Sequence, residues 1–157
     1  EIPQEGLISE LCWSDPGTTD QFRPNPRGAG CIFGPSNITA FLRLNNLNKI
    51  FRSHQLCQEG YQVYERLKAT KTTQEASEAN QPTQPKVSED LPNFNDEKIG
   101  LITVWSAPNY AYSNSNKATF FTIDEQQQIK ATFFDKSTDD HRIPKDGCRP
   151  SVSYYFA

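Results

Sequence analysis

The side chains able to do chemistry are few, and the most suggestive of them is an arginine beside two glycines. The run Arg27-Gly28-Ala29-Gly30 joins a guanidinium group to backbone that can turn sharply. A guanidinium fork together with backbone amides can hold an oxyanion, but the same run is also typical of an ordinary turn. The histidines are His54 and His141, and a lone histidine is more often a hydrogen-bonded structural residue than a metal ligand. Taken alone, these residues leave a functional and a structural role open.

Two tyrosines, Tyr110 and Tyr112, follow Pro108-Asn109 after an apolar run. A loop at a strand end is a usual place for binding residues, and also for plain turns. The sequence contains no Gly-rich phosphate loop, no His-Glu-x-x-His motif and no Gly-x-Ser-x-Gly motif. Motif chemistry of those kinds is therefore not indicated.

The cysteines are widely separated and form no Cys-x-x-Cys pair: Cys12, Cys31, Cys57 and Cys148. This spacing argues against a zinc ribbon and against a dense disulfide framework. Reduced thiols are the simplest interpretation, and they predict a cytoplasmic or nuclear location.

Composition limits the partners of this chain. Its 157 residues include 16 basic and 19 acidic side chains, for a formal net charge of -3. No basic field exists to attract nucleic acid or an anionic membrane, and no apolar run approaches the ~20 residues of a membrane span. We expect neither a nucleic-acid nor a membrane partner. Because the chain begins at Glu1 and has no methionine, we expect it to be a piece of a longer or processed protein.

The apolar pattern predicts an α/β (α+β) chain that is mostly β in its second half. Ile38, Phe41 and Leu42 have helical spacing and predict a helix that starts at Ser36 or Asn37 and ends near residue 45. The patch 7–13 predicts a short helix or a strand end. The expected strands are 49–52, 60–64, 101–105, 118–123 and 130–134.

Residues 68–98 interrupt this pattern. Thr, Gln, Glu, Ser, Pro and Lys dominate there, and the side chains that could anchor the segment are Val87, Leu91 and Phe94. Such a composition does not offset the entropy lost on ordering, so we predict a disordered insertion over 68–98.

Four short motifs occur in the order and near the spacing found in one protein family. They are Trp13-Ser14-Asp15-Pro16, Pro26-Arg27-Gly28-Ala29-Gly30, Arg52-Ser53-His54-Gln55 and Trp105-Ser106-Ala107-Pro108-Asn109-Tyr110. They resemble the C-terminal half of the catalytic domain of serine/threonine phosphoprotein phosphatases of the metallophosphatase type. The type-2A-like branch is most similar, and within it the fungal Ppg1-like, type-4 and type-6 subgroups. The resemblance implies the C-terminal portion of a calcineurin-like metallophosphoesterase β-sandwich flanked by helices. Residues 1–67 and 99–136 would be parts of that domain, and 137–157 a C-terminal tail.

The resemblance also implies roles for individual residues. Arg27 and Tyr110 match catalytic positions, a phosphate-clamping arginine and a tyrosine at the mouth of the site. His54 matches a metal ligand, and Trp13 and Asp15 match positions beside the substrate groove. The implied cofactors are two divalent metal ions, manganese or iron and zinc, that activate a water molecule for attack on phosphorus. The implied partners are phosphoprotein substrates and regulatory or scaffold subunits.

Other features leave a second interpretation open. The family motifs that supply most metal ligands, Gly-Asp-x-His-Gly, Gly-Asp-x-x-Asp-Arg-Gly and Gly-Asn-His-Glu, are absent here. The segment 111–116 also departs from the family pattern, and Ala157 stands where a leucine is usual. The alternative to an enzyme is therefore a non-catalytic, truncated or degenerate phosphatase that acts as a binding module. The matches at Arg27, His54 and Tyr110 favour the enzyme, and we expect the isolated chain to be inactive.

Overall fold

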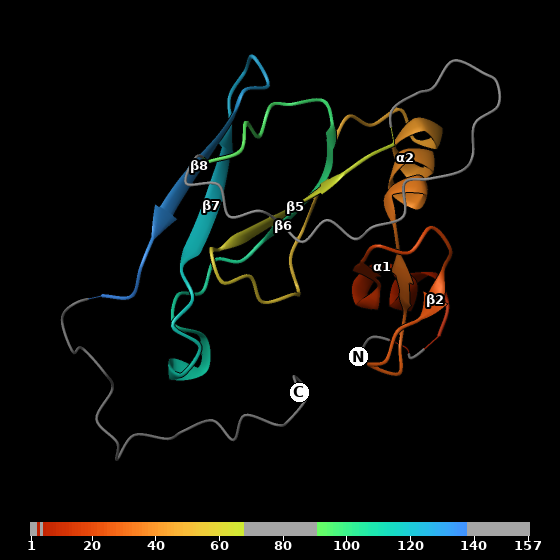
Figure 1. The fold of residues 1–157 in the computed structure, drawn as a ribbon, viewed down its shortest axis with the longest axis horizontal. Helices are drawn as coiled ribbons and strands as arrows, with labels where there is room; N and C mark the ends of the chain where they lie inside the picture. The colour runs from red at the N-terminus through yellow and green to blue at the C-terminus, as the bar shows by residue number, and fades with distance from the viewer. Residues whose placement is uncertain (1–2, 4, 68–90, 138–157) are drawn as a thin grey trace.

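The computed structural model describes residue 3, residues 5–67 and residues 91–137. In these residues, small sheets pack against a helix and a hairpin (Figure 1). The tail 138–157 and residues 68–90 of the expected insertion lie outside the described residues. In chain order the elements are α1 (Leu7–Trp13), β1 (Asp15–Pro16), β2 (Arg23–Pro24), β3 (Cys31–Phe33), α2 (Pro35–Leu44), β4 (Ile50–Arg52), β5 (Tyr61–Glu65), β6 (Ile99–Val104), the 3-10 turn η1 (Tyr110–Tyr112), β7 (Ala118–Ile123) and β8 (Ile129–Phe134). Within the described part of the chain, every helix is too short or too polar to cross a membrane.

Strand β6 is the centre of the fold. It pairs in parallel with β4 and antiparallel with β5, and its residues from Ile99 to Thr103 are buried. Successive side chains of a strand point to opposite faces of the sheet. Leu101 accordingly packs toward α2, while Ile102 packs toward the hairpin of β7 and β8. The strand expected at 101–105 is confirmed, with the bounds Ile99–Val104, and it is covered on both faces.

Each face of this sheet has its own apolar core. On one face, Ile38 and Leu42 of α2 pack with Leu101. On the other, Phe94, Ile99 and Ile102 pack with the inner residues of the hairpin, among them Phe121 and Phe133. The resulting order is helix, sheet and hairpin, which fits the expected piece of a sandwich flanked by helices.

Helix α2 begins at Pro35, slightly before the predicted start. Proline suits the first turn of a helix because its missing N–H would have no helical partner there. The side chain of Asn37 accepts a hydrogen bond from the Gly34 N–H at 3.1 Å, so Asn37 stabilises the start from inside the helix. The helix ends at Leu44, close to the predicted end.

Residues 91–98 differ from the prediction of a disordered insertion. The Phe94 side chain is 6% exposed, and its ring lies edge-on to Tyr61 and Phe121, with centroids 5.1 and 5.0 Å away. The Asn95 side chain donates to the Ile129 carbonyl and accepts from the Ile129 N–H. Lys49 Nζ donates to the carbonyls of Phe94 and Asp96. One buried aromatic ring and these bonds order the segment despite its polar composition.

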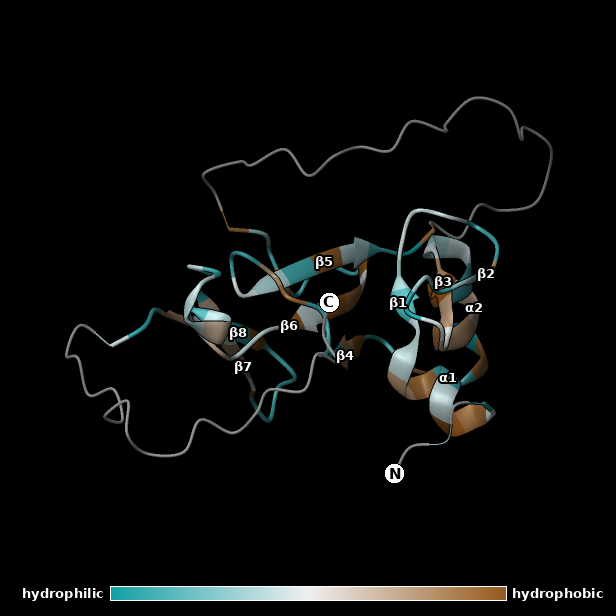
Figure 2. Ribbon diagram, turned by 90° about the horizontal axis from the view of Figure 1, so that it is seen from below, coloured by the Kyte–Doolittle hydropathy of each residue, from teal (hydrophilic) through white to brown (hydrophobic). Residues whose placement is uncertain are grey.

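The first third of the chain forms a sheet of very short strands in the order β1-β3-β2, which the sequence did not predict. Strand β3 is parallel to β1 and antiparallel to β2. Helix α1 comes directly before this sheet in the chain and carries several apolar residues, visible in Figure 2. Leu7 and Leu11 of α1 are 74% and 67% exposed.

Candidate functional site

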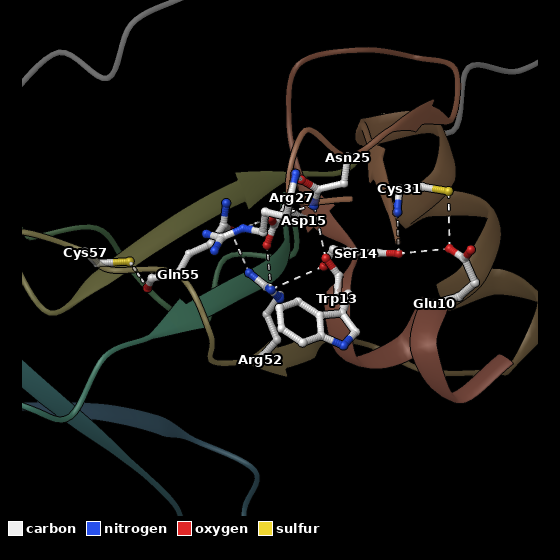
Figure 3. A network of polar contacts seen from close by, with 10 residues as sticks. All are labelled: Glu10, Trp13, Ser14, Asp15, Asn25, Arg27, Cys31, Arg52, Gln55 and Cys57. Atoms are coloured by element: carbon white, nitrogen blue, oxygen red, sulfur yellow. Dashed lines mark hydrogen bonds and ion pairs between the residues drawn. The ribbon is translucent and has the colours of Figure 1, made fainter. Parts of the chain in front are cut away.

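Polar side chains from three segments meet between β1 and β4 (Figure 3). Asp15 comes from β1, Arg27 from the turn that joins β2 to β3, and Arg52 from the end of β4. The two arginines approach the same carboxylate from different sides.

The Asp15 carboxylate is the centre of this cluster, and 8% of its side chain is exposed. Its Oδ1 accepts from Arg52 Nη2 at 2.9 Å, and its Oδ2 accepts from Arg27 Nε at 3.0 Å. Oδ2 also accepts from the amide Nδ2 of Asn25 at 2.8 Å. Charge-assisted bonds to both oxygens offset the cost of removing the carboxylate from water.

Arg27 is held by its own turn as well as by Asp15. Its backbone N–H donates to the side chain of Asn25 at 3.0 Å, and Gly28 N–H donates to the Asn25 carbonyl. Gly30 has a φ of 69°, and a Cβ built there would lie 2.6 Å from the backbone of Trp13 and Ser14. Glycine is required at position 30 because the turn packs directly against the chain that leads into β1.

The Arg27 side chain is tied to the cluster through one of its three guanidinium nitrogens. It is 29% exposed, and Nε is the atom that bonds to Asp15. Across residues 5–67 and 91–137, Nη1 and Nη2 of Arg27 form no hydrogen bond, which leaves two adjacent donors for a ligand. The geometry suits an anion with several oxygens, because a guanidinium group binds such anions through parallel donors.

A cleft with a volume of about 490 Å³ lies beside this cluster. Its polar lining includes Asp15, Arg23, Asn25, Arg27 and Gln55. A second hollow of about 320 Å³ lies at the carboxyl ends of β4 and β6, with Ser53 and Ser106 in its wall. Loops at the carboxyl ends of parallel strands commonly bind ligands.

Arg52 is the more deeply buried arginine, with 14% of its side chain exposed. Nη2 donates to Asp15 and to the Ser14 carbonyl, and Nη1 donates to Gln55 Oε1 at 2.6 Å. Burial lowers the pKa of Arg52, and the neighbouring Asp15 charge acts against that shift. Its donors are turned inward, so Arg52 serves the cluster rather than the cleft.

His54 follows β4 and has a strained backbone, with a φ of 87°. Its ring lies edge-on to Trp13, with centroids 5.2 Å apart. Burial lowers the pKa of His54, the positive charges of Arg27 and Arg52 lower it further, and Asp15 opposes them. The neutral imidazole is thus favoured, which is the form that coordinates a metal ion.

This region offers His54 as a candidate metal ligand but does not form a complete metal site within the described residues. The Nε2 atom of His54 is buried, and the lowered pKa of the ring favours the neutral form that coordination requires. Among the described residues, however, no three or more His, Cys, Asp or Glu side chains are grouped so as to hold a metal. A complete coordination shell would need ligands from further polypeptide.

Tyr110 lies apart from the other predicted site residues. It belongs to η1, on the loop after β6, and its ring is edge-on to Trp105 with centroids 4.8 Å apart. Figure 1 shows η1 near the hairpin, away from α1 and β2. The structure therefore brings Trp13, Asp15, Arg27 and His54 together, but not Tyr110.

The loop that carries Tyr110 is strained and tied to one buried amide. Asn109, Ala111 and Tyr112 have φ values of 47°, 53° and 57°. Asn116 is fully buried, and its side chain accepts from the Tyr110 N–H and donates to the Ala107 carbonyl, each at 2.8 Å. Backbone strain of this kind persists only where the surroundings fix the chain.

The cluster also contains Arg52, Asn25 and Gln55, which the sequence did not single out as site residues. Arg52 and Gln55 stand within the Arg52-Ser53-His54-Gln55 motif, and a buried cation next to a metal-ligand position was the available signal. Asn25 had a weaker signal, as a turn-forming residue two positions before Arg27.

Comparison with known proteins gives relatives of one kind, although no protein-family model matches the chain. The chain is 33% identical to the serine/threonine-protein phosphatase PP2A-like PPG1 of Saccharomyces cerevisiae, over 93% of this chain and 34% of that protein. It is 34% identical to the serine/threonine-protein phosphatase ppe1 of Schizosaccharomyces pombe, over 90% of this chain and 36% of that protein. It is 35% identical to the serine/threonine-protein phosphatase 4 catalytic subunit of Candida glabrata, over 86% of this chain and 33% of that protein.

A solved structure agrees with these relatives. A protein serine/threonine phosphatase from Saccharomyces cerevisiae, with similarity to human phosphatase PP5, superimposes with a TM-score of 0.61 at 26% identity. The match covers 90% of this chain and 38% of that one. The chain thus spans about a third of the length of the curated relatives it matches.

Proposed function

From the homology of this chain to a segment of the PP2A-like serine/threonine protein phosphatases, we propose that it supplies the phosphate-binding side of a phosphatase active site. The complete protein would hydrolyse phosphoserine and phosphothreonine monoesters in other proteins. The observation that carries this proposal is Arg27, which is fixed at Nε by buried Asp15 while Nη1 and Nη2 remain for a ligand.

Arg27 would bind the phosphoryl group and neutralise the charge that grows on its oxygens in the transition state. Donors that are already oriented need little reorganisation when the reaction occurs, which makes such stabilisation effective. Asp15 would keep the guanidinium group in place, and Trp13 would border the substrate groove beside His54. Tyr110 is proposed to contact substrate from the loop after β6.

His54 would be a ligand to one of two divalent metal ions, with manganese or iron and zinc as the candidates. When bound, such a pair lowers the pKa of a water molecule so that hydroxide is present near neutral pH. The support from this chain is the buried Nε2 atom of the half-buried His54 ring and the lowered pKa of that ring. The other ligands would come from further polypeptide, as would regulatory or scaffold contacts.

A cytoplasmic or nuclear location is part of the same proposal. Cys12, Cys31 and Cys57 are free thiols, which suits a reducing compartment. Cell fractionation, with the bulk of the protein in the cytosolic and nuclear fractions, is the expected result.

The test is hydrolysis of phosphoserine and phosphothreonine peptides by the complete protein with Mn²⁺ added. We expect release of inorganic phosphate that a chelator abolishes. His54→Ala should reduce that release strongly, while an exposed-site control, Lys136→Ala, should not. Absence of hydrolysis in the complete, folded and metal-supplemented protein would contradict the proposal.

A non-catalytic binding module is the second candidate. The observation that favours it is that the described residues contain no group of three or more His, Cys, Asp or Glu side chains able to hold a metal ion. The same experiment separates the two candidates, because a module would bind the phosphopeptide in an Arg27-dependent manner and release no phosphate.

A further inference from the structure

We propose that Arg52 is a positioning residue that controls, through the Asp15 carboxylate, how Arg27 presents its donors. The inference rests on the proposed phosphate-binding role of Arg27 and assigns Arg52 no direct contact with substrate.

The two arginines share the Asp15 carboxylate, one at each oxygen. Oδ1 of Asp15 bonds to Arg52, and Oδ2 bonds to Arg27. A carboxylate can accept an arginine through two parallel bonds when both oxygens are available. Here Arg52 occupies one oxygen, so Arg27 is limited to a contact through Nε.

This limitation matters for the ligand. If Oδ1 were released, the carboxylate could rotate and accept from both Nε and a terminal nitrogen of Arg27. That bidentate pair would withdraw from the cleft one of the donors that now remain for a phosphoryl oxygen. Arg52 therefore keeps the guanidinium group of Arg27 open toward the cleft.

Arg52 itself is not placed to bind the ligand. Its side chain is half as exposed as that of Arg27, at 14% against 29%. Both terminal nitrogens are in use, Nη1 on Gln55 and Nη2 on Asp15 and Ser14. Binding a phosphate would require breaking those bonds at a buried position.

Charge leads to the same conclusion. Two guanidinium groups around one carboxylate leave a net positive charge in the cluster. Without Arg52, Asp15 and Arg27 would neutralise each other, and the attraction for a phosphate anion would weaken. The second arginine thus preserves the charge as well as the orientation of the first.

The test is a double-mutant cycle in the complete protein, with inorganic phosphate as the probe and calorimetric Kd as the readout. The variants are Arg27→Ala, Arg52→Gln and the double variant. We expect Arg52→Gln to weaken phosphate binding about tenfold in the parent and less than about twofold in the Arg27→Ala background. Arg43→Gln, which removes an exposed arginine from α2, is the charge-matched control and should leave binding unchanged.

A second substitution keeps the test decisive if Arg52→Gln folds poorly, as circular dichroism and thermal melting would reveal. Gln55→Leu removes the partner of Arg52 Nη1 but leaves the cation in place, and it should give a smaller loss that also depends on Arg27. Equal losses of phosphate affinity with and without Arg27, or no loss in the folded variants, would overturn the role of Arg52. The proposed role of Arg27 would be unaffected. If Arg27→Ala itself leaves phosphate binding intact, the clamp and the role of Arg52 both fail.

Discussion

At the scale of single residues, the guanidinium group of Arg27 has one nitrogen bound and two without a partner among the residues that the structure describes. Nε donates to Asp15 at 3.0 Å, and the backbone N–H donates to Asn25. Lysine at this position would keep the positive charge. It would lose the planar fork that lets one guanidinium group contact Asp15 and a bound anion at the same time. Charge and shape can therefore be separated by substitution.

We predict that Arg27→Ala lowers kcat/KM for a phosphopeptide by two to three decades in the complete protein, about 3–4 kcal/mol, because a preorganised donor is lost. Arg27→Lys should recover part of that loss. The free energy of unfolding should fall by about 1 kcal/mol or less, since Asp15 retains Arg52 and Asn25. Turnover within about twofold of the parent, or an unfolded variant, would remove the clamp assignment.

The four clustered residues named from the sequence were found through short motifs, each readable in a local stretch. Arg52 also belongs to such a motif, but its partner Asp15 lies far away in the sequence and on another strand. Local patterns do not reveal which distant carboxylate a buried cation will meet. Tyr110 shows that a motif match does not fix where a residue lies. Its motif is intact, but it packs against Trp105 on the loop after β6, apart from the cluster.

The turn that carries Arg27 offers a matched pair of glycines. Gly28 and Gly30 both have positive φ, 84° and 69°, but a Cβ at Gly28 would have open space around it. At Gly30 the same atom would lie 2.6 Å from the backbone of Trp13. The two positions share the conformational cost and differ in the steric one.

We predict that Gly30→Ala costs about 2–4 kcal/mol of unfolding free energy and Gly28→Ala about 1–2 kcal/mol, because only the former adds overpacking to left-handed strain. Denaturant titration of both variants is the measurement. Equal losses would mean that the close approach to Trp13 contributes nothing to the turn.

At the scale of elements, strands β5 to β8 were predictable because they are five to six residues long and strongly patterned. Strands β1 to β3 have two or three residues each, too few for any periodicity to be read. The segment 91–98 escaped prediction for a different reason. Its average composition is polar, and a single ring, Phe94, anchors it in the core.

We predict that Phe94→Ala destabilises the complete protein by about 3–5 kcal/mol, the usual cost of emptying a buried aromatic site. Leu91→Ala, in the same segment but at a side chain that is 62% exposed, should change stability by less than about 0.5 kcal/mol. Thermal melting of the two variants provides the comparison. If Phe94→Ala were as mild as Leu91→Ala, the segment would not be anchored as the structure shows.

At the scale of the whole molecule, the described chain covers one part of its apolar surface and leaves another exposed. The central sheet is covered on both faces by α2 and the hairpin. By contrast, Leu7 and Leu11 of α1 and Leu44 of α2 are 67–80% exposed (Figure 2). The relatives are about three times as long as the part this chain matches, so more polypeptide is available in them to cover such faces.

We predict that a protein made of residues 1–157 alone is poorly folded and inactive. Exposed apolar side chains on α1 and short sheets with open edges favour aggregation, and the described residues include no group of three or more potential metal ligands. The purified chain should bind a hydrophobic dye such as ANS and should hydrolyse a small phosphoester no faster than its His54→Ala variant, with or without Mn²⁺. Replacing the matched third of the yeast PP2A-like phosphatase with this chain should reduce dye binding and give metal-dependent hydrolysis that His54→Ala removes. A monomeric, cooperatively melting isolated chain with metal-dependent turnover above the His54→Ala control would show instead that residues 1–157 fold and act without further polypeptide.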